Sequence, residues 1–298
     1  MKVFLGVPRG FCAGVVRAID IVEIALEKYG SPIYVKHQIV HNPHVVKDLE
    51  SKGAITVEDV DEIPEGSKVV FSAHGSPPSD FESAKQRNLE VIDATCPLVI
   101  KVHNEAKKYH AEGRKIILVG HKGHQEVKGT MGQVDMDLFD DRDTFTPFNE
   151  DSNMPVTILT QTTLSVDDTE ESINEVQGFY NDVIVRNDLC YATTNRQNAV
   201  KEICEYVDIF LVIGAQNSSN CNRLREVAES RGITSYLINN VGELKTDWLS
   251  GINNVGITSG ASTPDTLVQE VIDFINPTEV VPMGGEEENI KFVMPKKI

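Results

Sequence analysis

The segment Ala94-Thr95-Cys96-Pro97 decides the fold, because it marks a strand-to-helix boundary that recurs along the chain. Proline is favoured at the first position of a helix, where its missing N–H costs no hydrogen bond. Apolar Val99 and Val102 follow with helical spacing, and Gly113 ends the pattern. The segment therefore predicts a cysteine at the N-terminus of a helix, where the helix dipole favours a thiolate.

Two more cysteines repeat this arrangement at regular distances. Cys12 lies 84 residues before Cys96, and Cys190 lies 94 residues after it. A first set of polar residues follows the three cysteines by 28 or 29 positions: His41, His124 and Ser218. A second set follows them by 62 to 72 positions: His74, Thr162 and Ser262. Three cysteines and six polar positions in phase indicate an internal threefold repeat.

An extended apolar run precedes each of the six polar positions. The runs are residues 32–40, 68–72, 115–119, 156–160, 208–213 and 254–258. Helical stretches separate them, and strands that alternate with helices form parallel sheets. We therefore expect an α/β fold of three similar small parallel-sheet domains, covering residues 1–96, 97–190 and 191–276, with a C-terminal tail at 277–298. In such sheets ligands bind beyond the carboxyl ends of the strands, where the six polar positions fall.

The composition narrows the function classes. The chain has 298 residues and a formal net charge of −17 at pH 7, which argues against nucleic acid or an anionic membrane as its main partner. No apolar run reaches the roughly 18 residues of a membrane span, and the N-terminal residues predict a strand rather than a signal peptide. Five cysteines are an odd number, which speaks against a disulfide framework. We expect a cytoplasmic protein, in which cysteines are reduced, catalytic or bound to metal.

The three phased cysteines favour a metal centre. They are too far apart for a zinc finger and include no C-x-x-C pair. Three thiolates suit zinc with an open coordination position, or a cubane iron–sulfur cluster in which one iron has no protein thiolate. Three buried structural cysteines are the alternative interpretation. Of the other two cysteines, Cys204 on a predicted helix is interpreted as a packing residue. Cys221, in a candidate ligand loop, is interpreted as a serine-like small residue rather than a cluster ligand.

The polar loops offer many neutral hydrogen-bond donors and few cations. Besides three histidines they carry hydroxyl and amide side chains, including Ser219 and Asn220. Such donors, together with helix N-termini, suit an anion with many oxygens, such as a diphosphate. Glu126, two residues after His124, is a candidate proton donor to a leaving hydroxyl, although a solvated loop glutamate is the plainer interpretation. Neither a Walker A sequence nor G-x-G-x-x-G occurs, so nucleotide binding through those motifs is not indicated.

Short segments that contain these residues resemble those of a known family. They run in order from residue 10 to residue 263. They are Gly10-Phe11-Cys12-Ala13-Gly14-Val15, His41-Asn42-Pro43, Ala73-His74-Gly75, Ala94-Thr95-Cys96-Pro97, residues 120–126, Thr160-Gln161-Thr162-Thr163, residues 190–197, Ser218-Ser219-Asn220 and Gly260-Ala261-Ser262. On these segments the chain resembles the 4-hydroxy-3-methylbut-2-enyl diphosphate reductase family, which acts last in the non-mevalonate isoprenoid pathway. Cys221 departs from the family, which more often has serine there.

The resemblance implies a cofactor and a set of site residues. It implies a pseudo-threefold, trefoil-like arrangement of the three domains around a central [4Fe–4S] cluster, one per subunit. It implies that Cys12, Cys96 and Cys190 bind this cluster and leave one iron without a protein thiolate. It implies Glu126 as the proton source. The residues that it implies around the substrate diphosphate are His41, His74, His124, Thr162, Ser218, Ser219, Asn220 and Ser262.

The implied reaction removes the allylic hydroxyl of (E)-4-hydroxy-3-methylbut-2-enyl diphosphate by reduction. The products are isopentenyl diphosphate and dimethylallyl diphosphate, the isoprenoid precursors. Two electrons and two protons are consumed and one water leaves, and a small carrier such as ferredoxin or flavodoxin supplies the electrons. Three other function classes remain open on the residues alone. They are a cluster-dependent hydro-lyase that needs no reductant, a redox sensor or electron carrier, and a zinc hydrolase.

Overall fold

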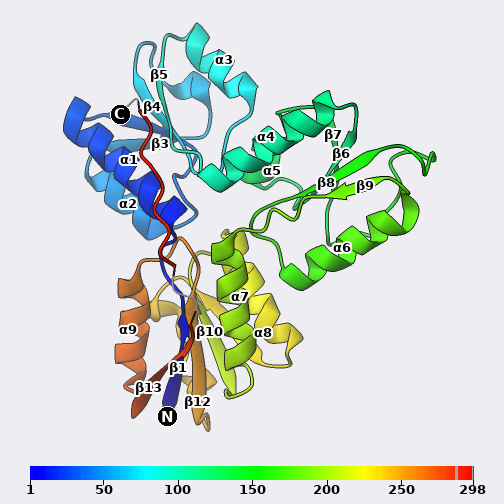
Figure 1. Ribbon diagram of the computed structural model, residues 1–298. Coiled ribbons are helices and arrows are strands. Elements are labelled where there is room, and N and C mark those ends of the chain that lie inside the picture. The colour runs from blue at the N-terminus through cyan, green and yellow to red at the C-terminus, as the bar shows by residue number, and fades with distance from the viewer. Residues whose placement is uncertain (286–287, 297) are drawn as a thin grey trace. The chain divides into compact units, whose positions relative to one another are not determined.

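The strands pair in parallel and form three separate sheets, shown with their helices in Figure 1. The computed structural model describes residues 1–285, 288–296 and 298. The chain divides into two compact units. Unit 1 comprises Met1–Val16, His41–Val45 and Cys190–Lys291, and unit 2 comprises Arg17–Val40, Val46–Leu189 and Phe292–Ile298. Within the described residues, no helix is both long enough and apolar enough to cross a membrane.

Sheets B and C are built by the first two thirds of the chain. Sheet B has the strand order β3 (Ala54–Val57), β2 (Ile33–Lys36), β4 (Lys68–Phe71), β5 (Glu90–Asp93). Its neighbours in sequence are α1 (Ala13–Tyr29), α2 (Pro43–Ser51), the short 3-10 helix η1 (Val60–Glu62) and α3 (Pro78–Gln86). Sheet C has the order β7 (Met136–Phe139), β6 (Lys115–Val119), β8 (Val156–Thr160), β9 (Val183–Val185). Its helices are α4 (Pro97–Ala111), α5 (Gln125–Met131) and α6 (Val166–Phe179).

Sheet A belongs to unit 1. Its strand order is β11 (Thr234–Ile238), β10 (Ile209–Ile213), β12 (Asn254–Ser259), β1 (Lys2–Val7), β13 (Glu279–Gly284). The associated helices are α7 (Tyr191–Ile203), α8 (Ser219–Ser230) and α9 (Asp265–Ile275), with 3-10 turns at Val241–Glu243 and Thr246–Leu249. In Figure 1, α9 lies on one side of this sheet, and α7 and α8 lie on the other.

Both faces of sheet A are buried, so its central strands are almost wholly apolar, as in most parallel sheets. In β10, Leu211 faces the core that contains Val268 of α9. Its neighbour Phe210 faces the opposite core, which contains Leu224 of α8. Sheet C is covered in the same way by α6 on one face and by α4 and α5 on the other. The helices therefore fix both faces of each sheet and leave the ends of its strands to carry function.

Each of the three cysteines lies where the chain passes from one sheet to the strands of another. β5 of sheet B ends just before Cys96, and β9 of sheet C ends just before Cys190. β1 precedes Cys12, and it pairs with β12 and β13 of sheet A rather than with the strands that follow it in sequence. The N-terminal strand thus takes the same fourth position in sheet A that β5 and β9 take in their sheets. The threefold repeat in sequence is therefore also a repeat in strand order.

The prediction of an α/β fold with three parallel sheets is confirmed. The helix predicted after Cys96 begins at Pro97 and ends before Gly113, whose φ of 80° suits glycine. The run predicted at 32–40 forms a strand only over Ile33–Lys36, because His37 has a left-handed φ of 59°. Strand β13 lies in the segment predicted as a tail, so that part of the tail belongs to sheet A. The proposed domain boundaries at residues 96, 190 and 276 remain predictions.

Candidate functional site

Cys12 and Cys190 both lie in unit 1, at the starts of α1 and α7. Both cysteines are half-buried, and neither is part of a disulfide. The backbone N–H of Cys12 donates to the Ala261 carbonyl at 3.1 Å. Cys190 is the N-cap of α7, and its Sγ accepts the N–H of Thr193 at 3.3 Å. This bond uses a helix N-terminal donor to hold the sulfur, as the sequence predicted for a thiolate at a helix start.

Tyr191 connects the segments that carry these two cysteines. Its hydroxyl oxygen accepts the backbone N–H of Ala13, the residue after Cys12, at 3.3 Å. Burial and then the negative charge of Cys12 raise the pKa of Tyr191 to about 12. The bond from the Ala13 N–H opposes this shift, and the negative charges of Glu288 and then of Cys190 add to it. Both thiols therefore lie close enough to act on one phenol. The sequence analysis did not include Tyr191, although its position directly after Cys190 was a usable signal.

Cys96 lies in unit 2 as the N-cap of α4. Its backbone N–H donates to the Ala73 carbonyl at 3.0 Å, which fixes it next to the loop of His74. Buried Arg17 donates to the carbonyl of Thr95 at 3.1 Å. Burial lowers the pKa of Arg17, and the negative charges of Asp93 and Cys96 oppose that shift. The segment of Cys96 therefore has a buried cation close by.

The neutral donors predicted for the site come together in unit 1. Ser218 and Ser219 lie at the start of α8, beyond the end of β10, and Ser218 is its N-cap. The Oδ1 of Asn220 accepts the N–H of Ala261 at 3.0 Å, which joins this loop to the one after β12. Ser262 in that second loop donates its hydroxyl to the carbonyl of His41 at 3.1 Å. The Nδ2 of Asn220 is buried and has no hydrogen-bond partner in the described part of the chain, so it is a donor available to a ligand.

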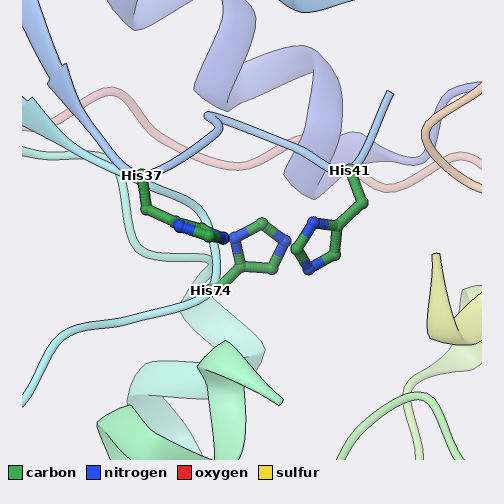
Figure 2. A group of neighbouring side chains, drawn as sticks. All are labelled: His37, His41 and His74. Carbon is green, nitrogen blue, oxygen red and sulfur yellow. The ribbon is translucent and has the colours of Figure 1, made fainter. Parts of the chain in front are cut away.

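Unit 2 brings histidines together at the ends of sheets B and C. The rings of His74 and His124 lie 6.2 Å apart, nearly perpendicular. His37, directly after β2, lies 5.9 Å from His74 in a similar edge-on arrangement, and Figure 2 shows this pair. The figure also labels His41, which belongs to unit 1. His37 was missed by the sequence analysis, because the predicted run at 32–40 placed it inside a strand, whereas β2 ends at Lys36, directly before it.

Glu126 is the carboxylate among the predicted site residues, and its surroundings shift its pKa. It lies in the first turn of α5 and is buried. Its two oxygens accept the backbone N–H of Thr162 at 2.6 Å and the Thr162 hydroxyl at 2.8 Å. Burial raises the pKa of Glu126 to about 7, the Thr162 bonds oppose the shift, and the charge of Asp188 adds to it. The residue is therefore not a solvated loop glutamate, and it can hold a proton near neutral pH.

His121, in the Glu126 loop, forms a group of potential metal ligands with Asp140 and Asp141. His121 Nε2 is 2.8 Å from an Asp141 carboxylate oxygen. Both oxygens of Asp140 are already occupied, by Arg142 Nε at 2.7 Å and the Lys122 N–H at 2.9 Å. Burial alone would raise the pKa of Asp140, but these bonds hold it well below its usual range. The group is thus an ion-pair network that anchors the loop before His124, rather than a metal site.

The two remaining cysteines are packing residues, as the sequence predicted for Cys204. Cys204 at the end of α7 lies in a hydrophobic core, and burial raises its pKa to about 11. Cys221 on α8 is fully buried, and burial also raises its pKa. Its sulfur lies against Gly214 and Gly260, where a Cβ atom would come within 2.3 and 2.2 Å of it. Neither thiol is placed or ionised like a metal ligand.

Comparison with known proteins extends over almost the whole chain. A family model described as LytB protein matches residues 3–276. The 4-hydroxy-3-methylbut-2-enyl diphosphate reductase 1 of Rhodopseudomonas palustris is 52% identical over 302 residues, covering 99% of each chain. Reductase 2 of the same name from Bradyrhizobium diazoefficiens is 50% identical over 305 residues, covering 100% of this chain and 99% of the relative.

Two solved structures of reductases are also similar to this chain. The structure of the E-1-hydroxy-2-methyl-but-2-enyl-4-diphosphate reductase from Plasmodium falciparum is similar with a TM-score of 0.91 at 38% identity, and the match covers 99% of this chain and 96% of that one. A structure of (E)-4-hydroxy-3-methyl-but-2-enyl diphosphate reductase, described as the terminal enzyme of the non-mevalonate pathway, matches with a TM-score of 0.66 at 34% identity. That match covers 92% of this chain and 99% of the other.

Proposed function

The chain belongs to the LytB protein family, and we propose that it is a 4-hydroxy-3-methylbut-2-enyl diphosphate reductase. In this reaction the allylic C–O bond of the substrate breaks, the oxygen leaves as water, and a C–H bond forms on the allyl fragment. Two electrons and two protons enter, and the products are isopentenyl and dimethylallyl diphosphate. The observation that carries the proposal is about 50% identity to reductases of this name over the full length of the chain.

We propose that Cys12, Cys96 and Cys190 hold one [4Fe–4S] cluster and leave one iron without a protein thiolate. The residues fit such a group, because all three cysteines are half-buried and outside any disulfide, and each lies at the start of a helix. The charges of Cys12 and Cys190 act on the same tyrosine, which supports a shared ligand for that pair. Cys96 belongs to unit 2, and its assignment to the same cluster rests on the family resemblance. When bound, the cluster would supply the electrons and a Lewis-acidic iron.

The polar loops would bind the substrate diphosphate. Ser218, Ser219, Asn220 and Ser262 of unit 1 offer neutral donors, and the unpaired Nδ2 of Asn220 supports this role. Unit 2 would add His74, His124 and Thr162, and His41 would contribute from unit 1. These donors are worth more against a charged phosphate oxygen than against a neutral acceptor. An anchored diphosphate restricts the motion of the allyl fragment and so lowers the entropic cost of the reaction.

Glu126 would supply the proton that leaves with the hydroxyl oxygen as water. Its pKa of about 7 means that a protonated fraction exists at neutral pH and that the proton can be given up. The bond between Thr162 Oγ1 and Glu126 at 2.8 Å gives a path by which the proton can pass from the buried carboxyl group through the threonine hydroxyl.

The electrons would come from a small carrier such as ferredoxin or flavodoxin. Half-buried cysteines outside any disulfide at Cys12, Cys96 and Cys190 need a reducing compartment, so we also propose a cytoplasmic location.

The test is an anaerobic assay of the purified protein with iron and sulfide analysis. Turnover of the allylic diphosphate with a chemical electron donor, yielding both isoprenyl diphosphates, is expected. Cys12→Ser, Cys96→Ser and Cys190→Ser should each lower the iron content, while Cys204→Ser serves as the matched control and should not. A cluster-loaded protein that forms no isoprenyl diphosphate overturns the proposal. Turnover without any reductant would instead indicate a hydro-lyase, and zinc in place of iron and sulfide a hydrolase.

A further inference from the structure

Arg196 is a fully buried arginine whose guanidinium joins three segments of unit 1. It lies on α7 with 0% of its side chain exposed. Nη1 donates to the Ala192 carbonyl at 2.9 Å, and Nη2 donates to the Gly10 carbonyl at 2.9 Å. Both nitrogens also bond the carboxylate of Glu288, at 2.8 and 3.1 Å. A buried charge of this kind is stable only when it is paired and its donors are used.

The segments that Arg196 joins are those of the two unit 1 cysteines. Gly10 lies two residues before Cys12, and Ala192 lies two residues after Cys190. The hydroxyl of Tyr191 makes a second link by accepting the N–H of Ala13. Arg196 therefore bonds the backbone on the N-terminal side of Cys12, and Tyr191 bonds it on the C-terminal side. Together the two side chains determine how the Cys12 loop lies against the start of α7.

Glu288 reaches Arg196 because strand β13 runs beside β1. Gly285 donates its N–H to the Val7 carbonyl at 3.1 Å, at the end of β1 that leads to Cys12. Gly284 has a φ of 102°, and a Cβ atom there would lie 2.1 Å from the Val7 carbonyl oxygen, so only glycine allows this approach. Asn195 of α7 adds a further contact to the Glu288 carboxylate at 3.4 Å.

We propose that the Arg196–Glu288 ion pair is a positioning device for the metal centre. It holds the Cys12 loop and the Cys190 end of α7 at the separation that a cluster shared by these two cysteines requires. This inference rests on the proposed function. Without the Glu288 carboxylate, the Arg196 guanidinium is an uncompensated buried charge and turns away from Gly10 toward water. The Cys12 loop then loses the link from Gly10 to α7, and metal ligands that are loosely supported release their metal more easily.

The experiment compares Glu288→Gln and Glu288→Asp with the parent protein after anaerobic reconstitution. Glu288→Gln keeps the size of the side chain but removes the charge. Glu288→Asp keeps the charge but shortens the reach. The first readout is the rate at which an iron chelator removes the cluster, at a temperature equally far below each protein's unfolding midpoint. The second is the electron paramagnetic resonance spectrum of the reduced cluster, which depends on ligand geometry. We expect cluster loss to be about 10-fold faster in Glu288→Gln, the order found when groups that hydrogen-bond to and support metal ligands are removed. Glu288→Asp should be intermediate, and both spectra should change.

Two controls separate positioning from general stability. Glu279→Gln, on strand β13 that precedes Glu288 in the chain, breaks an exposed ion pair with Lys2 of β1 and should leave both readouts unchanged. Ile203→Val loosens the buried core of α7 without touching either cysteine segment. If the Glu288 variants lose their cluster no faster than Ile203→Val, the inference is wrong. If the parent protein itself takes up no iron and sulfide, it is the proposed function that has failed.

Discussion

Unit 1 and unit 2 both carry polar loops beyond the carboxyl ends of parallel strands, but the loops differ in chemistry. In unit 2 the predicted site residues include His74, His124 and Glu126, which can take up or release protons. In unit 1, His41 apart, the residues predicted to bind the diphosphate are hydroxyl and amide side chains such as Asn220 and Ser262, which cannot titrate near neutral pH. The same α/β architecture therefore supports two tasks. We infer that unit 2 moves protons and that unit 1 mainly holds the substrate.

The titratable residues of unit 2 and the neutral residues of unit 1 also differ in how their buried polar groups are paired. Glu126 is buried with one threonine as its partner, and this environment raises its pKa to about 7. Asn220 is also buried, yet it keeps one amide donor without a partner in the described residues. Leaving a buried neutral amide without a partner costs a moderate amount of free energy, whereas leaving a buried charge without a partner costs much more. This difference explains why neutral donors suit the holding of an anion that comes and goes.

The largest effect is expected from Glu126→Gln. The amide keeps the shape of the side chain but cannot donate a proton as an acid. We expect kcat to fall by about 100-fold or more, the range of general acid catalysis, while KM changes little. In the parent protein the rate should fall as pH rises through about 7, because the protonated form is lost there. Steady-state kinetics of the variant across pH should show that this limb has disappeared.

Thr169→Val is a suitable control for the Glu126 variant, because Thr169 is also buried in unit 2 and its hydroxyl donates to the carbonyl of Ser165, the N-cap of its own helix. An unchanged kcat in Glu126→Gln would show that Glu126 of unit 2 does not supply the proton.

Asn220→Ala is the corresponding change in unit 1 and should act on binding. It deletes the free Nδ2 donor and the acceptor of the Ala261 N–H. A hydrogen bond to a charged group is worth about 1.5–3 kcal/mol, so KM should rise roughly 10- to 100-fold. The value of kcat and its pH dependence should stay close to those of the parent. Asn239→Ala, on an exposed loop of the same unit, is the control. A loss confined to kcat would contradict the inference that unit 1 holds the substrate while unit 2 moves protons.

Thr162→Val sharpens the comparison within unit 2. It removes the hydroxyl donor to Glu126 and keeps the backbone N–H donor. Losing a bond to the ionised form raises the pKa of Glu126 further, so the falling limb of the rate profile should move to higher pH. Loss of the threonine hydroxyl from the proton path should also lower kcat, on the order of 10-fold. A limb that moves to lower pH would show that Glu126 does not control it.

Local patterns were enough to predict the elements that carry the site. Pro97 and Gly113 bound α4 as expected, and the runs at 115–119 and 156–160 are β6 and β8 without change. The phased spacing also placed Thr162 among the site residues before its contact with Glu126 was known. These features depend on neighbours in sequence, which periodicity and capping describe well.

Long-range features were not predictable in this way. The pairing of β1 with β12 joins Lys2 to Asn254, and nothing in the local pattern of residues 2–7 indicates that partner. Burial of Glu126 likewise depends on the packing of its surroundings, so the sequence left open whether it was a solvated residue. The sequence assigned no separate role to Arg196, because its contacts with Gly10 and Glu288 are long-range. Such properties come from tertiary contacts rather than from propensity.

The smallest effect is expected from Cys221→Ser, which tests whether the fifth cysteine is part of either task. Its buried sulfur has hydrogen-bonding groups around it, including the hydroxyls of Ser218 and Thr263. A serine hydroxyl would therefore find partners, and the change in unfolding free energy should stay within about 1 kcal/mol. Activity and iron content should match those of the parent. Denaturant unfolding of the apoprotein and iron analysis check this, and a loss of iron would mean that Cys221 supports the metal centre after all.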